Sequence, residues 1–182
     1  MKTFLKILIS VLTLITIQAG TFFIDPTENA ISHNNYGLFY FKLEDYPAAI
    51  QEFKIAIALS PNSASSASFY NNLGLVYLRI NRYDWAINCF DTSISMCPNF
   101  LEYYVNLVKA YKGRKSLKFL SNKYRNQLSK NNSDYIPWLV LGLIDKEQNN
   151  KKAALNCFKE FKKLGPDELL GKAVENVIIN MR

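Results

Sequence analysis

The chain has 182 residues, of which 49% are apolar and 20% are charged, so a folded core is expected and wholesale disorder is excluded. Its single histidine, His33, excludes a histidine-rich metal site, and its seven glycines contain neither of the nucleotide-binding loop patterns. The formal net charge is +7, and the positive excess lies in residues 101–182, which carry 16 basic and 8 acidic side chains.

Residues 1–19 have the three-part form of a secretory signal. A positively charged start precedes an apolar run over residues 7–17, and Ile17-Gln18-Ala19 is an acceptable cleavage site. The alternative is an uncleaved membrane anchor, because the apolar run continued to residue 24 comprises 18 residues, close to the minimum for a spanning helix. Both alternatives predict export, to a periplasm or cell envelope, and are favoured over a third, a helix of a soluble cytoplasmic protein. Residues 20–29 then form a linker.

A pattern with a period of 34 residues organises residues 30–168. Its anchor is a glycine at Gly37, Gly74 and Gly142, and Val108 replaces this glycine in the third copy. Tyrosine, alanine, an aromatic residue and proline recur at fixed distances after the anchor in three or all of the copies. These residues are Tyr40, Tyr77 and Tyr111; Ala49, Ala86 and Ala154; Phe53, Phe90, Tyr124 and Phe158; and Pro61, Pro98 and Pro166.

The spacing and residue types resemble the tetratricopeptide repeat family, which implies two antiparallel helices per repeat. An all-α fold is therefore predicted, a right-handed α-solenoid of four helical hairpins over residues 30–63, 67–100, 101–134 and 135–168. Gly74 and Ala86 would let two helices approach closely, with Phe90 filling the space between them. The third copy lacks the small anchor, the alanine and the proline, so the regularity of its packing stays open.

A ninth helix is expected after the fourth repeat, within residues 167–182. Gly165 ends the preceding helix, Pro166 suits a first turn, and Asp167 and Glu168 face the positive end of the new helix. An apolar stripe from Leu169 to Ile178 follows. This segment is predicted to cap the solenoid, since the last repeat otherwise exposes a stacking face.

The resemblance further implies that the first helix of each repeat lines a concave groove that binds a peptide segment or helix of a partner. The leucines of this face could instead be buried between helices, and the asparagines could simply be solvated. An acidic chaperone tail is disfavoured, because only Asn72 agrees with the clamp that chaperone-binding members use. The predicted groove residues are Asn34, Leu38, Phe41, Asn71, Asn72, Leu75, Leu78, Asn106 and Lys109, joined in the third and fourth copies by Val105, Lys112, Leu139 and Leu143.

Residues 109–130 carry eight basic side chains and no acidic one, a pattern that attracts anionic partners. Anionic lipid headgroups or an acidic protein face are the expected partners, although a solvated helix face is the simpler alternative. Export argues against nucleic acid. The residues of this predicted basic patch are Lys112, Arg114, Lys115, Lys118, Lys123 and Arg125.

The sequence predicts no catalytic group, metal site or cofactor, so an enzyme is not expected. The three cysteines, an odd number, favour buried thiols over a disulfide scaffold. The predicted function is that of an exported, non-enzymatic scaffold or adaptor, with envelope assembly as its setting. The alternative is a peripheral membrane protein that docks through the basic third repeat. The oligomeric state stays open, with self-association through the third copy or the terminal cap as a third possibility.

Overall fold

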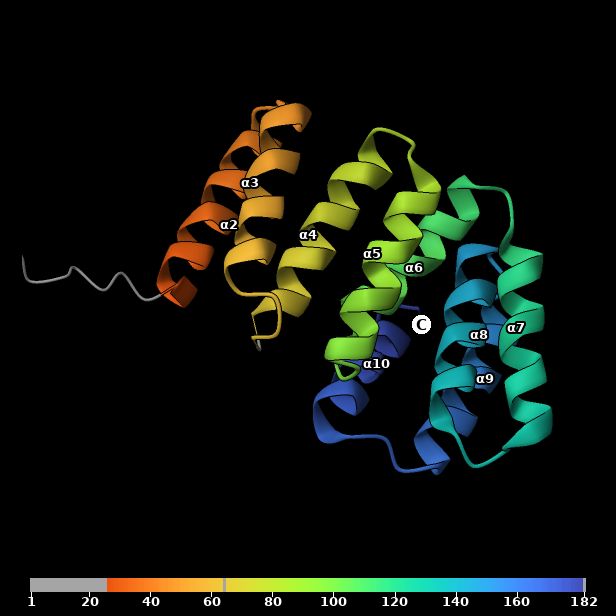
Figure 1. Ribbon diagram of the computed structural model, residues 1–182. Coiled ribbons are helices and arrows are strands. Elements are labelled where there is room, and N and C mark those ends of the chain that lie inside the picture. The colour runs from red at the N-terminus through yellow and green to blue at the C-terminus, as the bar shows by residue number, and fades with distance from the viewer. Residues whose placement is uncertain (1–25, 64, 182) are drawn as a thin grey trace, which may run out of the picture.

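The computed structural model describes residues 26–63 and 65–181, which form nine α-helices and no strand (Figure 1). The predicted all-α solenoid fold is confirmed. The predicted signal or anchor, and residues 20–25 of the predicted linker, lie outside the described residues. The helices are α2 (Pro26–Lys42), α3 (Tyr46–Leu59), α4 (Ser66–Arg79), α5 (Tyr83–Met96), α6 (Leu101–Gly113), α7 (Leu117–Lys130), α8 (Tyr135–Glu147), α9 (Lys151–Lys163) and α10 (Glu168–Ile179).

Each of the four predicted repeat ranges holds one pair of consecutive helices. Helix α2 begins at Pro26, so residues 26–29, predicted as the end of the linker, are helical instead. Proline suits this position because its fixed backbone angle fits a first helical turn and its missing N–H has no helical partner to lose there. No helix within the described part of the chain is both long and apolar enough to cross a membrane.

Close packing within three of the hairpins depends on the anchor glycines. A Cβ atom added to Gly37 or Gly74 would lie 2.6 Å from the ring of Phe53 or Phe90, and one added to Gly142 would lie 2.5 Å from Phe158. All three rings are fully buried. The glycine therefore lets the ring of the second helix lie directly against the backbone of the first, as the sequence predicts.

The turn inside each hairpin has the same backbone geometry in all four repeats. Glu44, Asn81, Lys115 and Asn149 each have a φ between 60° and 63°, in the left-handed region. The residue that follows each of them donates its N–H to a carbonyl five residues earlier, with N···O distances of 2.8–3.0 Å. This closure matches the way helices commonly end, and it reverses the chain within three residues.

The third hairpin is more open than the other three. Helices α6 and α7 make few close backbone contacts with each other, and α6 lies closer to α8 than to its own partner. Val108 and Leu120 stand where the other repeats have glycine and alanine. Both are fully buried, and Tyr124 is 6% exposed. Their larger side chains fill the space between the two helices, which explains why the helices are further apart.

Helix α10 does not simply cover the end of the stack. It packs against α9 and reaches across to α6. The Asp167 side chain accepts a hydrogen bond from the Leu170 N–H at 2.8 Å and caps the helix, and its second oxygen accepts from Asn99 Nδ2 at 3.2 Å. Leu170 and Val174 are buried, so the apolar stripe of α10 faces the repeats.

Candidate functional site

The inner face of the first two repeats presents apolar side chains to solvent. Leu38 and Phe41 of α2 and Leu75 and Leu78 of α4 are half-buried, with part of each side chain packed on the core. They occupy equivalent positions in the two repeats, so they form two rows across adjacent helices. Each of these side chains is therefore partly exposed on the inner face and partly buried between helices.

The inner-face asparagines are paired with one another across repeats. Asn72 Nδ2 donates to Asn34 Oδ1 at 2.9 Å, and Asn106 Nδ2 donates to Asn71 Oδ1 at 3.0 Å. Asn34, Asn71 and Asn106 are 8%, 5% and 3% exposed, so three of the four side chains are buried. These amides join the first helices of neighbouring repeats, and part of the hydrogen-bonding capacity predicted to serve a peptide is already used.

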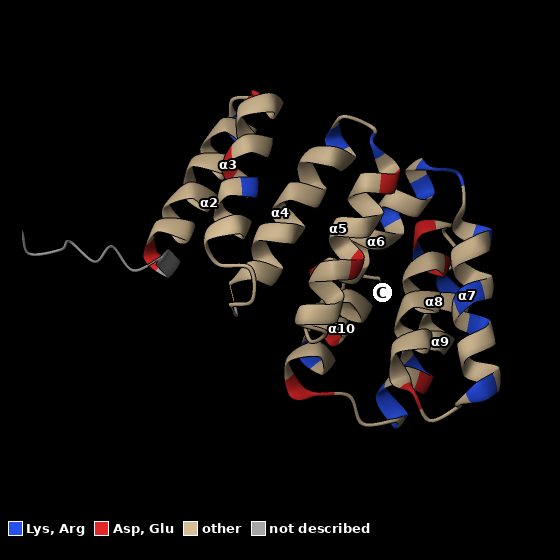
Figure 2. Ribbon diagram, in the orientation of Figure 1, with Lys and Arg blue, Asp and Glu red and all other residues tan. Residues whose placement is uncertain are grey.

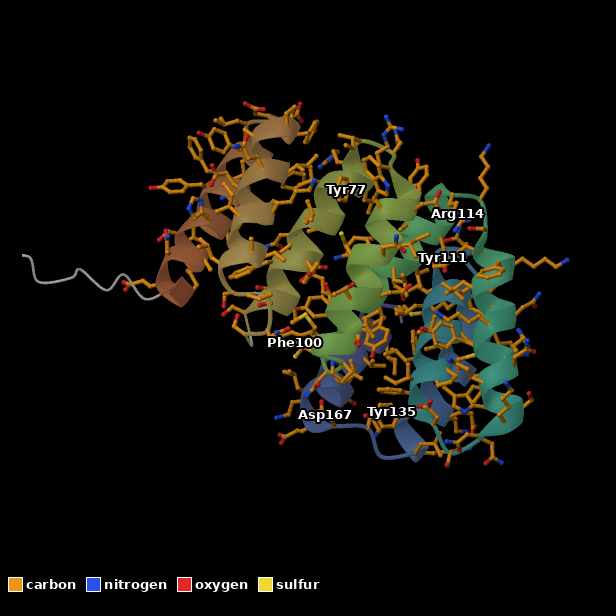
Figure 3. All side chains as sticks on the ribbon, viewed as in Figure 1. Tyr77, Phe100, Tyr111, Arg114, Tyr135 and Asp167 are labelled. Atoms are coloured by element: carbon orange, nitrogen blue, oxygen red, sulfur yellow. The ribbon has the colours of Figure 1, made fainter. Side chains whose placement is uncertain are left out.

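The C-terminal part of the inner face is partly filled by α10. Leu139 and Leu143 of α8 are buried rather than open to a partner. Between α6 and α10 a groove of about 430 Å³ remains, lined by Asn99, Phe100, Leu101, Glu102, Val105, Asn106, Lys109, Leu169 and Ala173. We call it the α6–α10 groove. Figure 3 labels Phe100, just before α6, and Asp167, just before α10, below it in the same part of the view.

The α6–α10 groove combines apolar walls with charge at its rim. Phe100 is 46% exposed and Leu169 is 51% exposed, while Val105 and Leu101 are half-buried. Glu102 and Lys109 are exposed, and within the described residues neither forms an ion pair. Apolar surface with a few polar groups at its edge is the chemistry that binds an amphipathic segment.

The residues of the predicted basic patch divide into paired and unpaired groups. Lys112 Nζ lies 3.0 Å from Glu147 Oε2, and Arg114 Nη1 lies 3.0 Å from Asp84 Oδ1. Both predicted cations are therefore partly neutralised by residues distant in the sequence. The other four, Lys115, Lys118, Lys123 and Arg125, form no ion pair within the described residues.

The unpaired cations lie on and just before α7, which contains no acidic residue (Figure 2). Lys118 and Arg125 are exposed, and Lys123 Nζ lies 5.6 Å from the centre of the Tyr124 ring. Phe119 stands among these cations, 63% exposed, with its ring stacked on Tyr111 at a centroid distance of 6.3 Å. We call the surface formed by Lys115, Lys118, Phe119, Lys123 and Arg125 the α7 face.

The titratable groups elsewhere in the molecule offer little reactivity. Burial raises the pKa of the Cys89 and Cys157 thiols to about 11, so both are protonated at neutral pH and are poor nucleophiles. Burial likewise raises the pKa of Asp91, although nearby Lys123 opposes the shift. His33 Nδ1 lies 2.6 Å from Glu52 Oε2 and joins α2 to α3. No cluster that could hold a metal ion occurs among the described residues.

Two features of the site escaped the sequence analysis. The asparagine pairs could have been predicted from the repeat pattern. Asn34 and Asn71 occupy one repeat position, Asn72 and Asn106 occupy the next, and each hydrogen bond joins one residue of each kind in adjacent repeats. The position of α10 beside α6 had no such signal. An amphipathic helix after the last repeat fits the end of the stack and the inner face equally well.

Comparisons with known proteins agree with this geometry. The chain is similar in fold to the crystal structure of MamA, at 20% identity and a TM-score of 0.51, covering 77% of this chain and 80% of that one. It is also similar to the second tetratricopeptide repeat domain of human RPAP3, determined in complex with an HSP70 peptide, at 19% identity and a TM-score of 0.50. That comparison covers 78% of this chain and 99% of the RPAP3 chain.

A third similar structure comes from Parabacteroides merdae, with 15% identity and a TM-score of 0.52; it covers 85% of this chain and 60% of that one. No curated protein sequence matches the chain. Residues 28–99, however, match the model of the tetratricopeptide repeat family. That match spans the first two hairpins, α2–α3 and α4–α5, and two further hairpins follow it. The predicted resemblance to the tetratricopeptide repeat family is therefore confirmed by the family model over residues 28–99 and by the repeat fold of the similar structures.

Proposed function

We propose that the protein is a non-enzymatic scaffold whose inner face binds an amphipathic helix of a partner protein. The observation that carries this proposal is the two rows of half-buried apolar side chains on α2 and α4. The α6–α10 groove adjoins α4, because Asn106 of its lining donates a hydrogen bond to Asn71 of α4. Such partly exposed apolar surface on a rigid concave face is typical of protein-binding sites. The similar RPAP3 domain was determined with a bound peptide.

The chain itself contains an example of the occupant. Helix α10 places Leu170 and Val174 against the repeats, and both are buried, while its polar residues face outward. The inner face next to α6 therefore receives the apolar stripe of a helix. A partner helix placed along α2 and α4 would continue this arrangement over the part of the inner face that α10 leaves open.

Replacing Leu75 or Leu78 by glutamate is expected to weaken partner binding about ten- to hundredfold, because a carboxylate would be buried without a counter-charge. The fold should persist, since both side chains are only half-buried. The measurement is in-cell crosslinking from a photoreactive residue at position 38, which should capture a partner in the parent chain and lose it in either variant.

The matched control for these variants is Leu164→Glu, at the end of α9 and outside the α2–α4 rows, where the leucine is 36% exposed. It should leave the crosslink unchanged. If all three variants retain the crosslink, or if all three lose it, the inner face is not the binding surface.

We infer that the protein works after export, in a periplasm or cell envelope, where envelope assembly is its setting. The support is the sequence of residues 1–19, with its positive start, apolar run and cleavage site. Amino-terminal sequencing of the protein recovered from cells should find a start near Gly20. An intact Met1 in a membrane fraction would indicate the uncleaved anchor, and an intact Met1 in the soluble cytoplasmic fraction would exclude export.

The α7 face supports a second candidate function, peripheral docking on an anionic membrane. Four unpaired cations surround an exposed aromatic ring on a helix without acidic residues. Changing Lys115, Lys118 and Lys123 to glutamate should abolish flotation with vesicles of anionic lipid, and high salt should do the same to the parent chain. Flotation that is equal in parent and variant would refute this function and leave the α7 face as a solvated surface.

A further inference from the structure

The first helix of the solenoid has an apolar face with no helix packed on it. Tyr36 and Phe39 of α2 are 57% and 56% exposed, and Leu43, one turn further on, is 61% exposed. The three residues recur at helical spacing, so they form one stripe on α2. Figure 1 shows α2 at the outer end of the row of helices, away from α4.

The same repeat positions are buried in every later repeat. Tyr36 corresponds to Leu73, Leu107 and Leu141, which are at most 5% exposed, and Phe39 corresponds to Val76, Ala110 and Ile144, which are at most 3% exposed. Each of these later pairs lies on a first helix that packs against the second helix of the preceding repeat. The exposed stripe on α2 is therefore a stacking surface that lacks its preceding repeat.

The opposite end of the solenoid offers the matching surface. Leu155 of α9 corresponds to Ile87 of α5, which is 5% exposed and belongs to the core, on a helix that packs against the following repeat. Helix α10 covers this end incompletely. A groove of about 670 Å³ remains between α9 and α10, lined by Leu155, Lys159, Lys162, Lys163, Glu175, Ile178 and Ile179. We call it the α9–α10 groove; Ile179, at its edge, is 57% exposed.

The two ends carry opposite charge. Around the α2 stripe, Glu28, Glu44 and Asp45 are exposed, and Lys42 is the one basic residue of α2. The α9–α10 groove is lined by three lysines and one glutamate. Lys162 pairs with Glu175 at 3.1 Å, and Lys163 pairs with Glu160 at 2.6 Å. Lys159 is exposed and forms no ion pair within the described residues. Apolar contact and charge complementarity thus favour the same pairing.

We propose that copies of this chain stack end to end, the α2 stripe of one copy seating in the α9–α10 groove of the next. This inference goes beyond the partner-binding function and does not depend on it. A second copy fits better than residues 7–24 of the same chain, because that segment has no charged residue to match the acids around the stripe. The contact joins different surfaces on the two copies, so it does not form a two-fold dimer, and each added copy leaves one stripe and one groove open for the next.

The decisive experiment mixes two variants, each of which disables one end. Phe39→Asp places a carboxylate in the α2 stripe, and Ile179→Asp places one at the edge of the α9–α10 groove. Both residues are more than half exposed, so the fold should persist, which circular dichroism checks. Sedimentation velocity of the parent chain, as recovered from producing cells, should show a series of species that grows with concentration.

Each variant alone should sediment as a monomer, with association weakened on the order of tenfold or more. An equimolar mixture should form dimers and nothing larger, because one functional stripe and one functional groove remain. Phe119→Asp, on the α7 face, is the matched control and should associate like the parent. Lys159→Glu should weaken association, and Glu44→Lys on the other copy should restore it.

Two results would overturn the proposal. One is a parent chain that stays monomeric at every concentration, as expected if another segment covers the α2 stripe. The other is an Ile179→Asp variant that associates like the parent while Phe39→Asp does not, which would mean that two α2 stripes pair with each other.

Discussion

Replacing Gly74 by alanine is expected to lower the free energy of unfolding by about 1–3 kcal/mol, although alanine is the better helix former. The added Cβ would lie 2.6 Å from Cε1 of the Phe90 ring, closer than two carbon atoms can approach. The Phe90 ring is fully buried, so it has no free space into which to move. Helices α4 and α5 must therefore separate, and equilibrium urea unfolding would measure the loss.

The control for this substitution is Gly171→Ala in α10. There the new Cβ would meet nothing closer than Pro166 Cγ at 3.7 Å, an ordinary contact. The gain in helix propensity then acts alone, and the change should be neutral or stabilising by up to about 1 kcal/mol. Equal effects at the two glycines would contradict the assignment of Gly74 to a close helix approach.

A double-mutant cycle isolates the contact itself. Phe90→Leu alone should destabilise the protein because it leaves part of the buried space between α4 and α5 empty. In the combined Gly74→Ala, Phe90→Leu chain the smaller side chain leaves room for the Cβ atom, so the two losses should sum to less than their separate values. Strict additivity would show that the two residues do not share the contact.

The local parts of this fold could be predicted from the sequence because each hairpin depends on contacts within about 34 residues. The anchor glycine, the alanine and the aromatic residue specify how closely two helices pack, and the pattern recurs three times. The same pattern shows that the third repeat has Val108 and Leu120 in place of the glycine and the alanine. How far α6 and α7 move apart could not be predicted, since that distance depends on how α8 fills the space beside them.

For the candidate site, the sequence could predict only which residues share one face of a single helix. Leu75 and Leu78 lie on the inner face because helical spacing places them there. The ion pair of Arg114 with Asp84 and the hydrogen bond of Asn99 to Asp167 join residues 30 and 68 positions apart. Such contacts follow from how repeats and α10 are placed in space, which no local pattern encodes. They decide which cations are free and how much of the inner face is open.

Restoring the repeat pattern in the third hairpin is expected to destabilise the protein, although substitutions toward a repeat consensus commonly stabilise. Leu120→Ala should cost about 2–5 kcal/mol, because Leu120 is fully buried and its removal leaves a cavity. Val108→Gly removes a second fully buried side chain and adds the cost of glycine in a helix, about 1 kcal/mol. Neither substitution alone draws α6 and α7 together, since their separation also accommodates Tyr124 and α8.

Asn132→Pro supplies the matched control, since it restores the third missing pattern residue at an exposed turn. No helix packing changes there, so the free energy of unfolding should shift by less than about 1 kcal/mol. Urea unfolding should therefore show a large loss in the free energy of unfolding for Leu120→Ala and Val108→Gly, and no large loss for Asn132→Pro. If Leu120→Ala instead raised the free energy of unfolding, α6 and α7 would be able to pack as closely as the helices of the other hairpins. Leu120 would then be keeping the two helices apart and destabilising the fold, rather than filling space between them.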